Sequence, residues 1–330
     1  MSVDDYVDKI YRLQTRLESY SKSVGFDLSK VLNARFKRLA AEVATGSTDS
    51  VKDVKKLERE FAEILQNTNA SQTIIINKAM ETGVISGYGA EQAGLALAGE
   101  VVSVKALNEQ RVINKAWRHV IDANNISVES AWDKYIGTSS NRVKTIPRMA
   151  YSQGWGITKT VARLREVTQI DKRSATTMAR TIVMSASNVA RDDVSRQAGV
   201  ESLIWKSTLD SRTTEYCAVR DGKVYKQGVG ERPPGHFSCR STMLSVPTDM
   251  SPTEFKKGLE VSTRGEDGKT VIKAYRTYGD FLKNQSKSFQ REVIGKKRTE
   301  LLRSGKITFD KMWTQDKNYI SVEKLRKLYG

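Results

Sequence analysis

Proline, cysteine and histidine are scarce in this 330-residue chain, and each scarcity limits what the protein can be. Only Pro147 falls within the first 232 residues, so proline does not interrupt long helices there. Two cysteines are too few for a disulfide framework, which fits folding in a reducing compartment. No apolar run is long enough to cross a bilayer, and the first residues are acidic rather than the apolar core of a secretory signal. We therefore expect a protein that is made and folded in a cytoplasm and that has no membrane partner.

Basic residues are in excess, and the excess is unevenly placed. The net charge is +17, although residues 1–141 carry equal numbers of basic and acidic side chains. Residues 142–196 hold 11 basic and 4 acidic residues, and residues 251–330 hold 19 and 10. Such a distribution favours an acidic partner, with nucleic acid as the first candidate. A merely solvated basic surface explains it equally well, because no compact arginine-rich run occurs.

Apolar residues recur at helical spacing through the front of the chain. Three amphipathic stripes are present, made by Val3, Tyr6, Val7, Ile10, Leu13 and Leu17, then by Leu28, Val31, Leu32, Phe36, Leu39 and Val43, and then by Val51, Val54, Leu57, Phe61, Ile64 and Leu65. Their spacing predicts helices, the second ending at Gly46 and the third capped by Ser50 with Asp53. Packing of these helices against one another explains the stripes better than a coiled coil with a partner, because the heptads do not persist.

The pattern changes near residue 200, which predicts a small α+β unit. A long helix is expected over 171–200, followed by a short strand at 203–205 and a second strand in "GKVYKQG" after a turn. We therefore predict a mainly α fold in three parts, which are a helical N-terminal region over 1–140, an α+β unit over 141–250 and a short, basic helical tail over 251–330.

The scarce histidine and cysteine residues gather inside that unit. The stretch "PPGHFSCRS" at 233–241 holds His236 and Cys239, and Cys217 ends the upstream stretch "LDSRTTEYC". Two thiolates and an imidazole are ligand types that zinc favours. Asp210 is the nearest candidate for a fourth ligand, which gives a structural zinc site made of Asp210, Cys217, His236 and Cys239. Weaker candidates for the fourth position are Glu215, Asp221 and water.

Other interpretations of the same residues stay open, because the spacing is not a familiar Cys-x-x-Cys pair. One is a Cys217–Cys239 disulfide in a mature extracellular particle, and another is a hydrogen-bonded knot without metal. The same residues could also form a catalytic site, with Cys217 as nucleophile, His236 as base and Asp210 orienting the base. A second catalytic possibility is a zinc ion with three protein ligands that activates water. No glycine-rich nucleophile turn or oxyanion loop accompanies these residues, so catalysis is the least favoured reading.

Several rare residues follow a fixed order between residues 170 and 247. They form an Ala-Arg-Thr helix, a tryptophan with a short strand, an Asp-x-x-Thr pair, a cysteine, a Gly-Lys turn and a closing Pro-Pro-x-His-x-x-Cys-Arg. In this chain those elements are Ala179, Arg180 and Thr181; Trp205; Asp210, Thr213 and Cys217; Gly222 and Lys223; and Pro233, Pro234, His236, Cys239 and Arg240. In this order and spacing the segment resembles the Mu F-like phage head morphogenesis family, the minor capsid proteins of tailed phages.

The tail is similar to a segment that often follows this motif in such head proteins. There an aromatic residue precedes a Gly-Lys-x-Arg-x-x-Leu-x-x-x-Gly stretch, which is met here by Phe289, Gly295, Lys296, Arg298, Leu301 and Gly305. Residues 1–140 carry no motif of the family.

The resemblance implies a structural, non-enzymatic protein of the virion. It would sit inside the capsid at the portal vertex, after synthesis in the host cytoplasm, and help head assembly, DNA packaging or DNA delivery. Its partners would be the portal protein, the major capsid or scaffold protein and the packaged double-stranded DNA. The basic segments agree with this location, because they lower the electrostatic cost of lying beside DNA.

A metal-dependent nuclease or other DNA-processing enzyme is the alternative. It accounts for the basic charge and the Asp/Cys/His group without a virion. Acidic residues are sparse near His236, which argues against a two-metal nuclease site. Arg240 follows the last cysteine, and we expect it to pair with Asp210 rather than with a phosphate.

Overall fold

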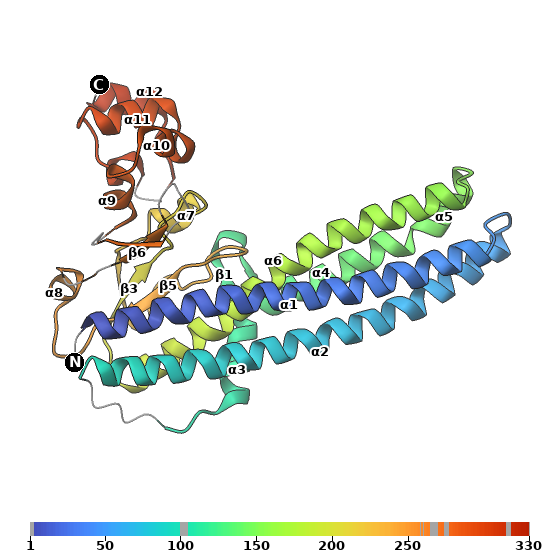
Figure 1. Cartoon of the computed structure of the whole chain (residues 1–330), viewed down its shortest axis with the longest axis horizontal. Helices are drawn as coiled ribbons and strands as arrows, with labels where there is room; N and C mark the ends of the chain where they lie inside the picture. Colours follow the sequence, from blue (N-terminus) through green and yellow to red (C-terminus); the bar gives the residue numbers. More distant parts are fainter. Residues whose placement is uncertain are drawn as a thin grey trace. The chain divides into compact units, whose positions relative to one another are not determined.

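The protein is mainly helical, and along the chain short antiparallel strands follow the long N-terminal helices and precede a group of short C-terminal ones (Figure 1). The predicted fold class, mainly α with a small α+β unit, is confirmed. The computed structural model describes residues 3–99, 105–257, 259, 261–264, 270–273, 277–314 and 318–329. Parts of the predicted tail between 258 and 276 therefore lie outside the described residues.

Among the described residues, six α-helices precede the strands of the α+β unit. They are α1 (Val3–Thr45), α2 (Val51–Leu97), α3 (Glu109–Arg118), α4 (Val128–Lys144), α5 (Ile146–Ser152) and α6 (Ile157–Gln197). Two short strands, β1 (Val120–Ile121) and β2 (Ile126–Ser127), pair between α3 and α4. Ser50 caps α2 as predicted, since its hydroxyl accepts from the amide of Asp53 and donates to that side chain. No helix within the described ranges is long and apolar enough to cross a membrane.

The first two predicted helices are a single helix, because α1 continues through Gly25. A Cβ atom at Gly25 would lie 3.1 Å from the hydroxyl of Thr176 in α6. The glycine therefore marks a close approach of two helices rather than a helix end. The predicted helix over 171–200 is confirmed, but it begins earlier, at Ile157, and forms the second half of α6.

The residues group into two compact units, each built from discontinuous segments. The helical unit contains residues 16–85 and 108–189, and the mixed unit contains residues 1–15, 86–107 and 190–330. The predicted boundaries at 140/141 and 250/251 stay predictions.

The helical unit is held by an apolar core and by one buried ion pair. Its apolar core includes Leu39 from α1, Phe61 from α2 and Leu164 from α6. Nearby along α1, a guanidinium nitrogen of Arg35 lies 2.5 Å from a carboxylate oxygen of Asp171, and both side chains are fully buried. Because a buried charge is costly without a partner, this pair fixes the register of α1 against α6.

In the mixed unit, a three-stranded antiparallel sheet lies next to the segments that hold the two cysteines and His236. Its order is β4 (Val224–Lys226), β3 (Ser202–Lys206) and β5 (Thr242–Ser245). The first two are the predicted strands, while β5 is a strand that the sequence analysis missed. In the central strand β3, Leu203, Ile204 and Trp205 are buried in succession, as expected for a short strand covered on both faces.

A buried polar network ties β5 to the helices of the mixed unit. The Glu91 carboxylate of α2 accepts hydrogen bonds from the hydroxyls of Tyr6, Ser195 and Ser245. It also pairs with Arg191 of α6, at 2.7 Å. Glu91 is fully buried, so its charge depends on these four partners.

The C-terminal helices share a core with the sheet region rather than forming a loose tail. They are α9 (Tyr278–Lys283), α10 (Lys287–Ile294), α11 (Lys296–Arg303) and α12 (Val322–Tyr329). They are preceded by α8 (Pro252–Lys257) and by a hairpin of β6 (Val261–Arg264) and β7 (Thr270–Lys273). Aromatic side chains such as Tyr278, Phe281 and Phe309 join Leu209 and Val219 of the sheet region in one apolar cluster. The helical character predicted for this region is confirmed.

Candidate metal centre

Cys217 is presented by a single turn of helix, α7 (Glu215–Ala218). Thr214 begins this turn with an extended backbone, and its side chain accepts a hydrogen bond from the amide of Cys217. The carbonyl of Cys217 accepts a hydrogen bond from Ser207, at 2.9 Å, which ties the turn to the end of β3. The thiol is therefore held by backbone contacts on both sides.

His236 and Cys239 come from the loop between β4 and β5, where glycine is required for a steric reason. A Cβ atom at Gly235 would lie 2.2 Å from the ring of Tyr216, so only glycine lets the loop pass this ring. The amide of Cys239 donates to the carbonyl of His236, and Ser238 between them has a left-handed backbone with φ of 58°. This tight turn brings the imidazole and the second thiol to one side of the loop.

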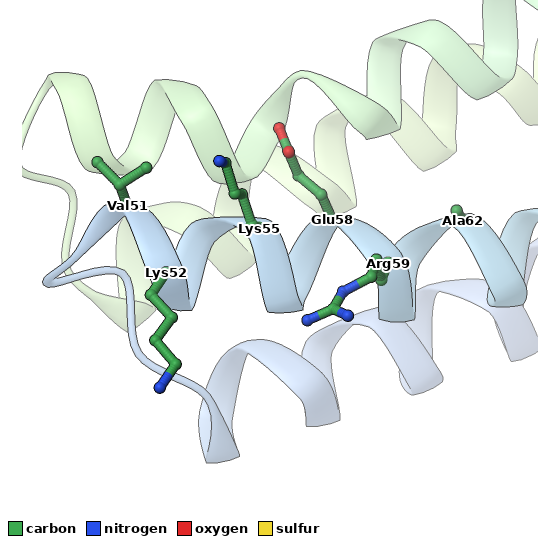
Figure 2. A pocket seen from close by; sticks show the side chains of 6 residues that line it. All are labelled: Val51, Lys52, Lys55, Glu58, Arg59 and Ala62. Atoms are coloured by element: carbon green, nitrogen blue, oxygen red, sulfur yellow. The ribbon is translucent and has the colours of Figure 1, made fainter.

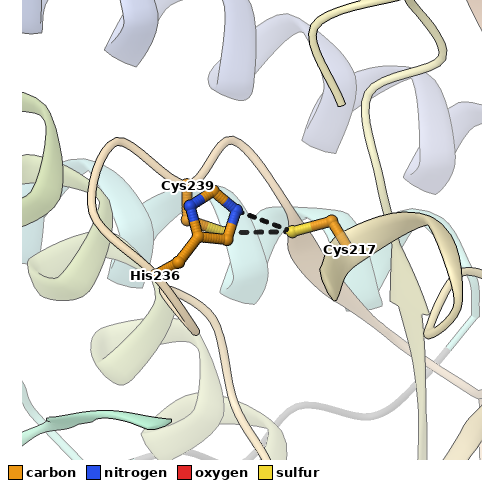
Figure 3. A group of neighbouring side chains, drawn as sticks. All are labelled: Cys217, His236 and Cys239. Atoms are coloured by element: carbon orange, nitrogen blue, oxygen red, sulfur yellow. Dashed lines mark hydrogen bonds between the residues drawn. The ribbon is translucent and has the colours of Figure 1, made fainter. Parts of the chain in front are cut away.

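The three side chains converge on one point (Figure 3). The Cys217 sulfur lies 3.1 Å from Nε2 of His236 and 3.6 Å from the Cys239 sulfur. All three ligand atoms lie within 4.8 Å of one another. Around a tetrahedral zinc ion, two sulfurs lie about 3.8 Å apart and a sulfur and a nitrogen about 3.5 Å apart. The group therefore fits a metal ion after movements of a few tenths of an ångström.

The histidine is held in the tautomer that can bind a metal. Its Nδ1 lies 2.8 Å from the carbonyl oxygen of Phe237, and a carbonyl can only accept, so Nδ1 carries the proton. The lone pair is then on Nε2, the atom that faces Cys217. A hydrogen bond from the other ring nitrogen to a carbonyl is the usual way in which proteins orient a metal-binding imidazole.

The two thiols are already unequal in acidity. The hydrogen bond to Cys239, together with burial, raises the pKa of Cys217 well above its usual value. Burial also opposes ionisation of Cys239, but hydrogen bonds with Cys217 and His236 lower its pKa well below the usual value. The same thiolate raises the pKa of His236 against the effect of burial. Cys239 is therefore the more acidic of the two thiols.

Asp210, predicted as the fourth ligand, is not part of this group. Its two carboxylate oxygens each lie 2.6 Å from a guanidinium nitrogen of Arg240, and Arg212 adds a contact at 2.9 Å. Burial opposes its ionisation, but these arginines outweigh burial and lower the pKa of Asp210 to about 2. The predicted pairing of Asp210 with Arg240 is confirmed, and it is the physical reason why this carboxylate is directed away from the thiols.

The two weaker acidic candidates also lie outside the group. The carboxylate of Asp221 accepts from the Ser207 amide at 2.6 Å and pairs with the buried ammonium of Lys206 at 3.2 Å. Glu215 lies in the first turn of α7, and burial raises the pKa of its carboxyl. The hydroxyl of Thr214 lies 2.9 Å from Nε2 of His236. None of the three acidic side chains considered from the sequence is therefore part of the group.

Two supporting residues were not anticipated from the sequence. Thr214 caps α7 and reaches the imidazole, a role that the Thr-x-x-Cys spacing could have suggested. The ring of Tyr216 contacts three parts of the site, since it packs beneath Gly235, lies edge-on to His236 and stacks under the guanidinium of Arg220 at 3.4 Å. No pattern in the sequence distinguishes this tyrosine, because its contacts come from separate segments.

A different hollow lies on the helical unit, along the first turns of α2 (Figure 2). Its volume is about 750 Å³, and it is lined by Val51, Lys52, Lys55, Glu58, Arg59 and Ala62. The carboxylate of Glu58 is already paired with Arg148. The remaining lining side chains are exposed, so the hollow has no buried polar group to select a ligand.

Residues 141–244 match a family model described as "Phage Mu protein F like protein". The matched segment contains all three residues of the candidate metal centre. No curated protein and no solved structure matches the chain. The family predicted from the order of rare residues is confirmed for this segment.

Proposed function

Because residues 141–244 belong to the Phage Mu protein F like family, we propose that the chain is a structural minor head protein of a tailed bacteriophage. The family points to head morphogenesis, and that match is the observation that carries the proposal. More specifically, we propose that the protein lies inside the capsid at the portal vertex and helps head assembly, DNA packaging or DNA delivery. Its partners are the portal protein, the major capsid or scaffold protein and the packaged double-stranded DNA. Its role is structural rather than enzymatic.

The charge of the C-terminal helices supports contact with DNA. Exposed cationic side chains are spread over residues 277–329, namely Lys283, Lys287, Arg291, Lys296, Lys297, Arg303, Lys306, Lys311, Lys324, Arg326 and Lys327. Exposed lysines and arginines near phosphates release condensed counterions and so lower the free energy of lying beside DNA. Since the helices below them share an apolar core with the sheet region, these charges are presented on a folded surface.

The candidate metal centre is proposed to hold structural zinc through Cys217, His236 and Cys239. His236 and Cys239 both come from the loop between β4 and β5. An ion would tie this loop to α7 and add its binding free energy to the stability of the sheet region. Asp210 would stabilise the same region through Arg240 rather than through the ion.

The head assignment is tested by quantitative mass spectrometry of purified particles from the source phage. We expect a fixed ratio of this protein to the portal subunit that survives nuclease treatment. Absence from the particles, together with abundance in the lysate, would overturn the assignment.

Zinc is tested by metal analysis of the purified chain. We expect about one zinc per chain for a site of this type, and loss of the metal in His236→Ala and Cys239→Ser. Asp210→Asn is the matched control and keeps the metal. A wild-type chain purified without chelators that holds no zinc, and takes up none when zinc is added, would refute the zinc site but not the head assignment.

The nuclease alternative receives no support from the site. The nearest carboxylates, Asp210 and Asp221, are paired with basic side chains, so neither is directed toward the three metal-ligand atoms. Incubation of the chain with plasmid DNA and divalent metal tests this directly. Cleavage that disappears in His236→Ala would restore the alternative.

A further inference from the structure

One stretch of α2 has an unusual surface. Residues 64–90 contain only two charged side chains, Lys78 and Glu81, in a chain in which 28% of residues are charged. Two isoleucines of the stretch face solvent, Ile74 with 70% and Ile85 with 51% of its surface exposed. Isolated exposed isoleucines are ordinary, but here they flank the only two charges of the stretch.

These four side chains lie on one face of the helix. Their spacing of four, three and four residues follows the helical period, so they form a single row about three turns long. The opposite face packs into the helical unit, where Ile76, Ala79, Met80 and Val84 are fully buried. The row is therefore directed away from the core, and none of the ion pairs between described residues involves Lys78 or Glu81.

The row is self-complementary. Reversing the helix about a point between residues 79 and 80 exchanges Ile74 with Ile85 and Lys78 with Glu81. A two-fold axis at that point would set each isoleucine against an isoleucine and each lysine against a glutamate. This is the relation that an isologous interface requires, in which residue i contacts j and j contacts i.

We propose that this face of α2, defined by Ile74, Lys78, Glu81 and Ile85, binds the same face of a second copy of the chain in an antiparallel arrangement. The charges select the direction, because a parallel pair in register would set Lys78 against Lys78 and Glu81 against Glu81. Exposed Ala70 and Ser71 extend the row by a turn and are small enough for close helix approach.

The contact is small, and its strength follows from its size. A row of about 16 residues spans roughly 24 Å, so the interface falls below the ~1,200 Å² typical of stable complexes. Association is therefore expected to depend on concentration and to be favoured where copies are crowded. It does not rest on the proposed head function, since it follows from one helix face.

The proposed dimer is tested by reversing the charges of residues 78 and 81, singly and together. Sedimentation velocity of the full chain over a range of concentrations is expected to show a reversible dimer at low salt. Lys78→Glu places two glutamates opposite each other, and Glu81→Lys places two lysines, so each variant should weaken the dimer by about tenfold. The double variant Lys78→Glu/Glu81→Lys restores opposite charges and should dimerise like the wild type.

An equimolar mixture of the two single variants is the decisive sample. Each Lys78→Glu chain carries two negative charges on the face and each Glu81→Lys chain two positive charges, so the mixture should form heterodimers. Lys37→Glu, an exposed lysine of α1, makes the same change in net charge and should leave the dimer unaffected. The proposal is overturned by a wild type that stays monomeric up to the highest soluble concentration. It is equally overturned by single variants that dimerise like the wild type, or by a mixture that does not associate.

Discussion

Replacing Asp210 with asparagine separates its two possible roles, as a partner of arginine and as a metal ligand. In the structure both carboxylate oxygens receive hydrogen bonds from Arg240, whose side chain is only 10% exposed. Burial opposes ionisation of Asp210, but these bonds and those from Arg212 lower its pKa from 3.8 to about 2. At about 1.4 kcal/mol per pH unit, that difference corresponds to about 2.5 kcal/mol of stability at neutral pH.

The loss in Asp210→Asn is expected to be between about 2 and 4 kcal/mol. Asparagine keeps one acceptor but leaves the Arg240 charge buried without its partner, and removing one member of a buried pair costs about 3–5 kcal/mol. Urea unfolding at pH 7, followed by circular dichroism, measures the change. Asp8→Asn is the matched control, because Asp8 pairs with Arg12 at a site where the two side chains are 58% and 72% exposed. Its effect should stay below about 0.5 kcal/mol.

The metal content of the same variant completes the test. If Asp210 acts only through Arg240, zinc content is unchanged while stability falls. A variant with wild-type stability would refute the reasoning about the ion pair. A variant that loses zinc while remaining folded would show that Asp210 is a ligand, as the spacing of the sequence first indicated.

Four further changes test other parts of the structure. Cys239→Ser should make the C-terminal half sensitive to protease while residues 16–85 stay resistant, and unaltered resistance with unaltered thermal stability would count against a metal-linked loop. Acid titration should show the contribution of Asp210 intact above pH about 4 and lost as pH falls toward 2, because its folded pKa is depressed; an equal acid response in Asp210→Asn would contradict this. Gly235→Ala should lower the melting temperature and displace Tyr216, seen as altered near-ultraviolet circular dichroism, because the added Cβ would lie 2.2 Å from that ring. Glu91→Gln should cost about 3–5 kcal/mol in urea unfolding, because it leaves the buried Arg191 charge uncompensated, and a change below 1 kcal/mol would refute that role.

The helical face that we propose as a self-association surface was not apparent from the sequence alone. In the sequence, Ile74 and Ile76 belong to the same short apolar run, "TIIIN", and nothing in the run distinguishes them. Only the packed structure shows that Ile76 is buried while Ile74 is exposed. A run of three similar residues on a helix must point in three directions, and neighbouring helices decide which of them is covered.

The sequence by itself determined much of the local structure and the resemblance of one segment to a known family. Apolar residues at helical spacing predicted the helical front of the chain and much of α6, although α1 was expected as two helices, because amphipathic helices carry their burial pattern in the chain. The order of rare residues identified the Mu F-like segment, and the gathering of Cys217, His236 and Cys239 predicted that they would meet.

Tertiary structure decided which charged groups pair and which segments share a core. A carboxylate binds the strongest donor within a few ångströms, and distances through space cannot be read from spacing along the chain. Asp210 therefore pairs with Arg240 instead of completing the metal centre, and Asp221 pairs with Lys206. For the same reason the mixed unit unites residues 1–15 with 190–330, because burial of apolar surface depends on contact and not on sequence order.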